Sequence, residues 1–168
     1  MTSVWFFVVG ATIGSFLNVV VHRLPLGIPL RHPKSRCPVC EVPIRRGDNL
    51  PIVGWLRLRG RCRSCGTRIS IRYPLIEASM GFLFLGLLHG ELLTGGANLP
   101  VRVPNSYANV LWIIWYTKWD LIGLFLYHAF LLSTLLVVVL IRCDSNPIPR
   151  QFLRFSILAG IGFSTIWP

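Results

Sequence analysis

Two Cys-x-x-Cys pairs constrain this chain more than any other feature: Cys37 with Cys40, and Cys62 with Cys65. Both pairs lie in one polar segment between two long apolar stretches. A Cys-x-x-Cys turn directs two thiolates toward one ion, and two such turns supply the four sulfur ligands of a tetrahedral zinc site. Disulfides or redox dithiols are the alternative interpretation. We favour zinc, which makes Cys37, Cys40, Cys62 and Cys65 the predicted metal ligands.

The hydropathy of the chain indicates a membrane protein. Hydrophobic residues make up 53% of the sequence, charged residues 14%, and the mean hydropathy is +0.60. A helix needs roughly 20 apolar residues to span a bilayer. We predict transmembrane helices in 1–21, 74–93 and 110–142, and a shorter apolar segment within 143–168. The predicted fold is therefore an all-α polytopic membrane protein of three or four transmembrane helices, with a small zinc-ribbon-like insertion at 22–73.

The distribution of basic residues predicts the orientation in the membrane. Twelve of the seventeen Lys and Arg residues lie in 22–73, whereas Arg102 is the one basic residue of 94–109. Lys and Arg accumulate in cytoplasmic loops. We therefore expect the 22–73 loop to be cytoplasmic and the 94–109 loop to be extracytoplasmic.

The first apolar stretch has the position of a secretory signal peptide. It has no basic segment before it and no small-x-small cleavage site, and the polar Ser15 and Asn18 interrupt its core. We expect it to be retained as a helix.

A net charge of +11 also suits nucleic-acid binding, because a ribbon that carries Arg57, Arg59, Arg61 and Arg63 could lie along phosphates. A basic loop next to a membrane has a simpler origin in topology and in attraction to anionic headgroups. We expect the lipid bilayer as the partner of this surface and not nucleic acid. Because four cysteines close the predicted zinc site, the metal is expected to be structural.

Several polar residues of the apolar stretches have two interpretations. Gly14, Ser15 and Asn18 suit either close packing of helices or the polar wall of an active site, and both stay open. Glu77 begins the second stretch, where a carboxylate can act as a helix-dipole partner. His128 lies inside the third stretch, and we interpret it as a neutral, hydrogen-bonded packing residue.

A longer series of motifs runs from Ile13 to Glu77. In chain order these are Gly14-Ser15-Phe16-Leu17-Asn18, Arg23-Leu24-Pro25, the first Cys pair, Asp48-Asn49-Leu50-Pro51, Trp55, Arg59-Gly60-Arg61-Cys62 and Ile71-Arg72-Tyr73-Pro74-Leu75-Ile76-Glu77. Together they resemble the N-terminal domain of bacterial type IV prepilin peptidases, aspartic peptidases of family A24.

The resemblance implies a multi-pass enzyme of the bacterial inner membrane that cuts the basic leader from prepilins and pseudopilins at the cytoplasmic face. In many members the enzyme also methylates the new N-terminus with S-adenosylmethionine, a cofactor that is expected here from the resemblance only. The substrate implied is a prepilin or pseudopilin. Residues 143–168 would then begin the peptidase region.

The family's peptidase step uses two aspartates, because one carboxylate activates water while the other, protonated, donates to the scissile carbonyl. Asp144 is the candidate for the first, since Asp144 to Arg150 resembles the family segment with an Ile-Pro pair, although the interval to Pro149 is shorter than usual. The second aspartate belongs to a Gly-x-Gly-Asp motif that this sequence does not contain. Asp48 and Asp120 are not expected to replace it.

Four interpretations stay open. The chain is the front part of a prepilin peptidase, a half-enzyme completed by a partner chain that carries the second aspartate, a non-hydrolytic paralogue, or a membrane-anchored zinc-ribbon adaptor. A basic ribbon would repel a leader rich in Lys and Arg, which argues against the ribbon alone as the leader receptor.

Overall fold

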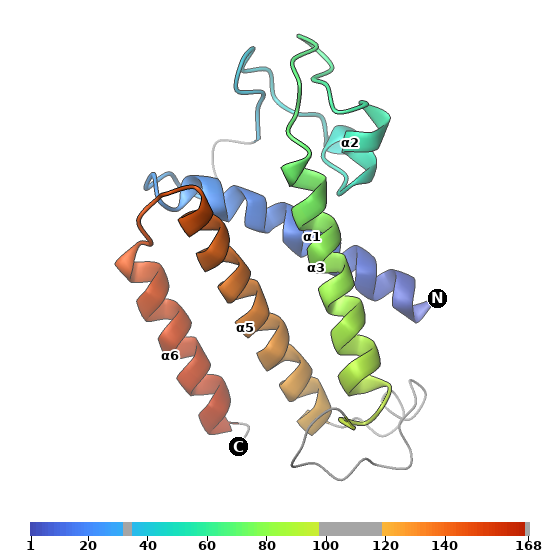
Figure 1. The fold of residues 1–168 in the computed structure, drawn as a ribbon, viewed down its shortest axis with the longest axis vertical. Helices are drawn as coiled ribbons and strands as arrows, with labels where there is room; N and C mark the ends of the chain where they lie inside the picture. Colours follow the sequence, from blue (N-terminus) through green and yellow to red (C-terminus); the bar gives the residue numbers. More distant parts are fainter. Residues whose placement is uncertain (32–34, 98–118, 167–168) are drawn as a thin grey trace. The chain divides into compact units, whose positions relative to one another are not determined.

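The computed structural model of the chain describes residues 1–31, 35–97 and 119–166, and its regular secondary structure is helical. The described part contains no β-strand, only isolated antiparallel bridges that pair Arg36 with Pro43 and Arg61 with Arg68. Figure 1 shows the helices, which are in chain order α1 (Thr2–Arg23), η1 (Arg46–Asp48), α2 (Val53–Arg57), α3 (Arg72–Leu87), the π-helical turn η2 (Leu88–Leu92), α5 (Trp119–Cys143) and α6 (Arg150–Ile166).

Three of the described helical segments are long and apolar enough to cross a membrane. They are Thr2–Arg23 with mean hydropathy 2.1, Arg72–Leu92 with 1.4 and Trp119–Cys143 with 2.5. The predicted class, a helical membrane protein, is confirmed. The predicted third region starts at 110, but 110–118 lie outside the described residues, as does most of the 94–109 loop. The helix α6 has 17 residues, so a fourth crossing stays a prediction.

The chain divides into two compact units, Met1–Phe82 and Leu83–Pro168, which we call the N-terminal and C-terminal units. The N-terminal unit contains α1, the Cys loop with η1 and α2, and most of α3. Its buried apolar side chains come from both long helices: Ala11, Leu17, Val20, Val21, Ile76 and Met80.

Small residues allow α1 and α3 to approach closely. A Cβ atom on Gly14 would lie 2.8 Å from the Cα of Glu77, and one on Gly81 would lie 2.6 Å from the ring of Phe7. The side-chain amide of Asn18 donates a hydrogen bond to the carbonyl of Tyr73 over 3.3 Å. For Gly14 and Asn18, the structure therefore supports the helix-packing interpretation.

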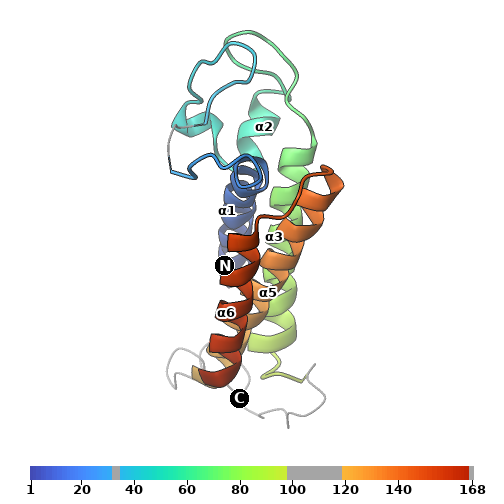
Figure 2. The same cartoon turned by 90° about the vertical axis from the view of Figure 1, so that its left-hand side faces the viewer.

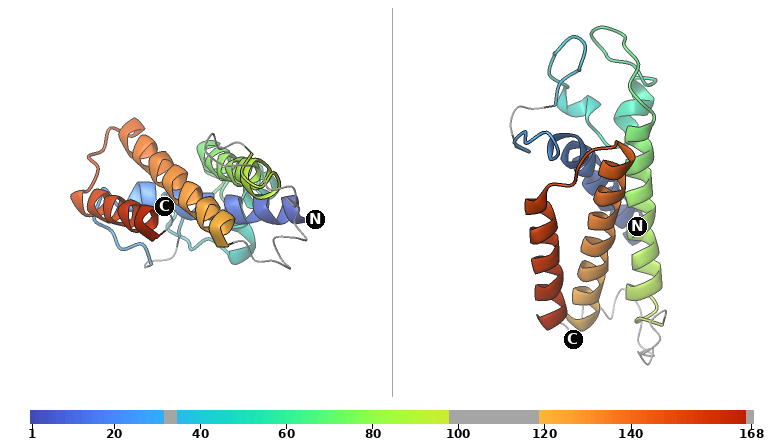
Figure 3. Two further views of the ribbon diagram at one scale, coloured as in Figure 1. Left: turned by 90° about the horizontal axis from the view of Figure 1, so that it is seen from below. Right: turned by 60° about the vertical axis from the view of Figure 1, so that its left-hand side comes forward.

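In the C-terminal unit, α5 and α6 form an antiparallel pair joined by a short turn (Figures 2 and 3). The turn begins at the end of α5, where Ser145 adopts φ 58° and the N–H of Asn146 bonds to the carbonyl of Ile141 over 3.1 Å. Aromatic rings fill the contact between the helices, with the rings of Phe130 and Phe163 5.8 Å apart. The hydrogen bond at the turn and the ring contacts between α5 and α6 together hold the end of α5 in place.

Candidate functional site

The two Cys-x-x-Cys segments fold into equivalent turns. In the first, the N–H of Cys37 bonds to the carbonyl of Val42 and the N–H of Glu41 bonds back to the carbonyl of Cys37. In the second, the N–H of Cys62 bonds to the carbonyl of Thr67, and the N–H of Gly66 bonds to Cys62. The residue after each pair is left-handed, with φ 55° at Glu41 and 71° at Gly66. Glycine adopts this conformation freely, whereas glutamate does so with strain.

These turns bring four sulfur atoms together. All four Sγ atoms lie within 4.8 Å of one another, with Cys37 3.7 Å from Cys65 and Cys40 3.9 Å from Cys62. Sulfurs at the corners of a tetrahedron around zinc are about 3.8 Å apart, since Zn–S is near 2.3 Å, whereas a disulfide requires about 2.05 Å. The cluster has the geometry of a site that could hold a metal ion, and its donor set fits zinc.

The surroundings favour the thiolate form at Cys37 and Cys62 and the thiol form at Cys65. The backbone amides of Cys40 and Val39 lower the pKa of the Cys37 thiol to about 6, and those of Cys65 and Ser64 lower the pKa of the Cys62 thiol. At Cys65 the amide of Thr67 also acts to lower the pKa, but burial and the neighbouring sulfurs outweigh it and raise the pKa to about 12. Thiolates crowd one another here, and a shared dication would relieve that repulsion.

An ion pair holds the loop beside the second turn. The Nη2 atom of Arg63 lies 2.6 Å from Asp48 Oδ1, and Nε lies 2.8 Å from Oδ2, so the contact is bidentate. The hydrogen bonds from Arg63 lower the pKa of the Asp48 carboxyl. The backbone approaches closely here too, since a Cβ on Gly54 would lie 2.2 Å from the Asp48 carbonyl oxygen. Asp48 is thus a structural residue of the loop.

Glu77 connects the loop to α3. Its carboxylate is buried, and Oε2 accepts a hydrogen bond of 2.7 Å from the backbone N–H of Ile52. Ile52 adopts φ 59°, an unusual value for a β-branched residue, directly before α2. The sequence interpretation of Glu77 as a helix-dipole partner missed this contact, because its partner is a backbone group 25 residues away.

Asp144 follows the last residue of α5. Its N–H bonds to the carbonyl of Leu140 over 3.1 Å and its side chain is exposed. Asp120 lies in the first turn of the same helix. At 1.5 Å per residue, the two aspartates are about 36 Å apart along α5. As expected from the sequence, Asp120 cannot form a catalytic pair with Asp144 in this unit.

His128, which the sequence analysis interprets as a hydrogen-bonded packing residue, has a buried carboxylate of the C-terminal unit as its partner, and this partner was not predicted. His128 Nδ1 lies 2.6 Å from Oε1 of Glu91, which is only 2% exposed. Among the described residues, Oε2 of Glu91 has no hydrogen-bond partner. Glu91 belongs to the π-helical turn η2, and π turns are frequent at functional sites. The only signal for this partner in the sequence is an acidic residue at the end of an apolar stretch.

Comparisons with known proteins agree on one family. Residues 8–90 match the Bacterial Peptidase A24 N-terminal domain. The prepilin leader peptidase/N-methyltransferase of Myxococcus xanthus is 49% identical over 118 residues, which cover 67% of this chain and 35% of the relative. The protein of the same name from Klebsiella pneumoniae is 50% identical over 99 residues, covering 55% and 42%.

The protein of this name from Neisseria gonorrhoeae matches more of the chain. It is 34% identical over an alignment of 184 positions, which covers 95% of this chain and 62% of the relative. The chain therefore spans between about a third and three-fifths of the length of these relatives. No solved structure matches the chain.

Proposed function

Because residues 8–90 are a bacterial peptidase A24 N-terminal domain, we propose that the chain forms the front part of a prepilin leader peptidase/N-methyltransferase. The main support for this proposal is the match of nearly the whole chain to a relative of that name. The proposed substrate is the basic leader of a prepilin or pseudopilin. The family match over residues 8–90 includes the four cysteines, and the match to the protein from Neisseria gonorrhoeae covers 95% of the chain.

In this proposal Asp144 is one of the two catalytic aspartates. Its place at the end of a candidate membrane span gives its carboxylate access to water at the membrane boundary. Hydrolysis of a peptide bond requires one ionised carboxylate to activate water and one protonated carboxyl group to donate to the carbonyl oxygen. Asp120 is at the other end of α5, so we assign the second role to an aspartate outside these 168 residues.

We propose that the four cysteines hold a structural zinc ion. Four sulfur ligands leave no open position for substrate or water, so the metal organises the loop and does not enter the reaction. A loop this short buries few apolar side chains, and structural zinc contributes on the order of 10 kcal/mol to the folding of such modules. The role of the ion is thus to hold the two Cys turns together.

The proposed location is the bacterial inner membrane, with the 22–73 loop in the cytoplasm. The concentration of basic residues in that loop supports this orientation. S-adenosylmethionine is proposed as a cofactor on the names of the relatives alone.

A second candidate function is a non-catalytic, membrane-anchored zinc-ribbon adaptor. The separation of Asp144 from Asp120 favours it, because the acidic side chains of α5 do not form a pair. An adaptor would keep the metal centre and the membrane helices and would bind an assembly protein without cutting it.

A cleavage assay separates these functions. The purified chain, supplied with a polypeptide that carries the second aspartate, is mixed with a prepilin in lipid vesicles, and the products are identified by mass spectrometry. The peptidase proposal expects cleavage that is lost in Asp144→Asn and retained in the matched control Asp120→Asn. Cleavage by Asp144→Asn at the wild-type rate would exclude the role of Asp144, and no cleavage by any variant, even with a partner chain that carries the second aspartate, would favour the adaptor.

A further inference from the structure

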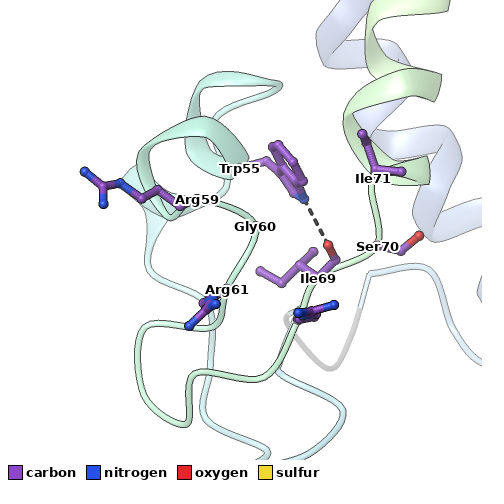
Figure 4. A pocket seen from close by; sticks show the side chains of 8 residues that line it. Trp55, Arg59, Gly60, Arg61, Ile69, Ser70 and Ile71 are labelled. Carbon is purple, nitrogen blue, oxygen red and sulfur yellow. Dashed lines mark hydrogen bonds between the residues drawn. The ribbon is translucent and has the colours of Figure 1, made fainter.

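A cavity of about 640 Å³ lies beside the second Cys turn in the N-terminal unit (Figure 4). Its walls carry three arginines, Arg59, Arg61 and Arg68, together with the indole of Trp55 and the side chain of Ile71. No carboxylate lines it among the described residues. Two acidic side chains of the N-terminal unit have other partners, since Asp48 is paired with Arg63 and Glu77 accepts from the N–H of Ile52.

Two of these arginines lie opposite each other. Arg61 and Arg68 form an antiparallel bridge, in which the Cβ atoms of facing residues are about 5 Å apart. Like charges directly opposite each other destabilise such a pair. An anion held between the two guanidinium groups would convert this repulsion into attraction, and guanidinium binds phosphate oxygens through two parallel hydrogen bonds.

The apolar wall of the cavity is preformed. Trp55 Nε1 donates a hydrogen bond of 3.1 Å to the carbonyl of Ile69, which is drawn as a dashed line in Figure 4. This bond fixes the plane of the indole. Gly60 adopts φ 65°, and a Cβ at this position would lie 2.7 Å from the indole ring. With its N–H already used, the indole offers the cavity an apolar face and no donor.

The position of the cavity indicates where its ligand comes from. Ile71 lines the cavity, is 58% exposed and directly precedes Arg72, the first residue of a candidate membrane span. Tryptophan and arginine are typical of membrane interfaces, and basic segments next to a span attract anionic lipids. The ligand that meets both the charged and the apolar wall is therefore a lipid.

We propose that this cavity is a binding site for the headgroup of an anionic phospholipid. Arg61 and Arg68 bind the phosphate, Arg59 adds positive charge, and Trp55 and Ile71 contact the glycerol and the first acyl carbons. None of the four cysteines lines this site, and the site does not depend on the proposed peptidase activity.

The test is native mass spectrometry of the full chain in detergent, titrated with phosphatidylglycerol, with phosphatidylcholine or with soluble glycerol 1-phosphate. The variants are Arg61→Gln and Arg68→Gln, and the matched control is Arg46→Gln, which removes the same charge from the same loop outside the cavity. We expect preferential binding of phosphatidylglycerol, weakened roughly tenfold or more in either cavity variant and less than about twofold in the control.

Equal weakening by all three variants would overturn the proposal, because binding would then reflect the overall charge of the loop. Binding of glycerol 1-phosphate as tight as that of the lipid would also overturn it and assign the cavity to a soluble phosphate ester. Limited proteolysis of each variant checks that the loop stays folded. Arg61 and Arg68 lie on opposite arms of the second Cys turn, and the variant that stays folded carries the test if the other unfolds.

Discussion

Glu77 Oε2 accepts a hydrogen bond of 2.7 Å from the backbone N–H of Ile52, and this contact joins α3 to the middle of the metal-binding loop. The carboxylate is buried, and Ile52 is held at φ 59° directly before α2. Besides the connections at its two chain ends, the loop is thus attached to α3 at a strained backbone position.

Glu77→Ala should destabilise the N-terminal unit by about 1–3 kcal/mol, because the amide of Ile52 loses its charged acceptor. Glu77→Gln keeps an acceptor oxygen and should cost less. Denaturant unfolding in detergent measures both, and proteolysis within 46–57 reports the loop. Equal stability of Glu77→Ala and the wild type would show that the contact is not structural.

The pair formed by Asp48 and Arg63 should make the stability of the loop depend on pH. Its hydrogen bonds lower the pKa of Asp48 in the folded chain below the ordinary value of 3.8. The contribution of the pair is therefore complete above about pH 4 and is lost as the pH falls through the lowered pKa.

The difference in melting temperature between the wild type and Asp48→Asn measures this contribution, since the thiols titrate in both proteins. The difference should be largest near pH 7 and should shrink as the pH approaches 3. A difference that stays constant over this range would contradict the role of the ionised carboxylate.

The approach of α1 to α3 should make Gly14 sensitive to a single methyl group. A Cβ there would lie 2.8 Å from a backbone atom of Glu77 and 3.0 Å from the carbonyl oxygen of Ile76. We expect Gly14→Ala to destabilise the unit by about 1–3 kcal/mol. Gly86→Ala is the matched control, because nothing lies within 4 Å of its added methyl group. Thermal unfolding in lipid measures both, and similar melting temperatures would contradict the close packing.

The pair formed by Glu91 and His128 should couple η2 to α5. Removing one partner leaves the other without its hydrogen bond, and either alanine substitution should cost about 1–3 kcal/mol. The double variant should cost less than the sum of the two, with a coupling energy above about 0.5 kcal/mol. Additive effects in this double-mutant cycle would show that the two side chains do not interact in the membrane.

The features that the sequence predicted are those with a local signal. Hydropathy over 18 residues or more located the membrane helices, and the Cys-x-x-Cys spacing identified the four sulfurs that the structure brings together. Both signals depend on residues close in sequence.

The features that the sequence did not predict depend on distant partners. Glu91 and His128 are 37 residues apart, and Glu77 bonds to a backbone amide, which leaves no trace in residue type. Similarly, Arg61 and Arg68 read as separate charges until the second Cys turn places them opposite each other. The sequence and the structure both place Asp144 at the end of the third apolar helix. Its catalytic role stays a prediction.

The metal content of the purified chain tests whether the four cysteines hold a zinc ion that keeps the loop folded. The purified chain, Cys62→Ser and the control Cys143→Ser, an exposed cysteine outside the cluster, are analysed for bound metal and for proteolysis within 35–69. We expect one zinc ion per chain in the wild type and in Cys143→Ser, and loss of both zinc and protease resistance in Cys62→Ser. A wild-type chain that binds no metal, or whose loop keeps its resistance after the metal is removed, would contradict the account.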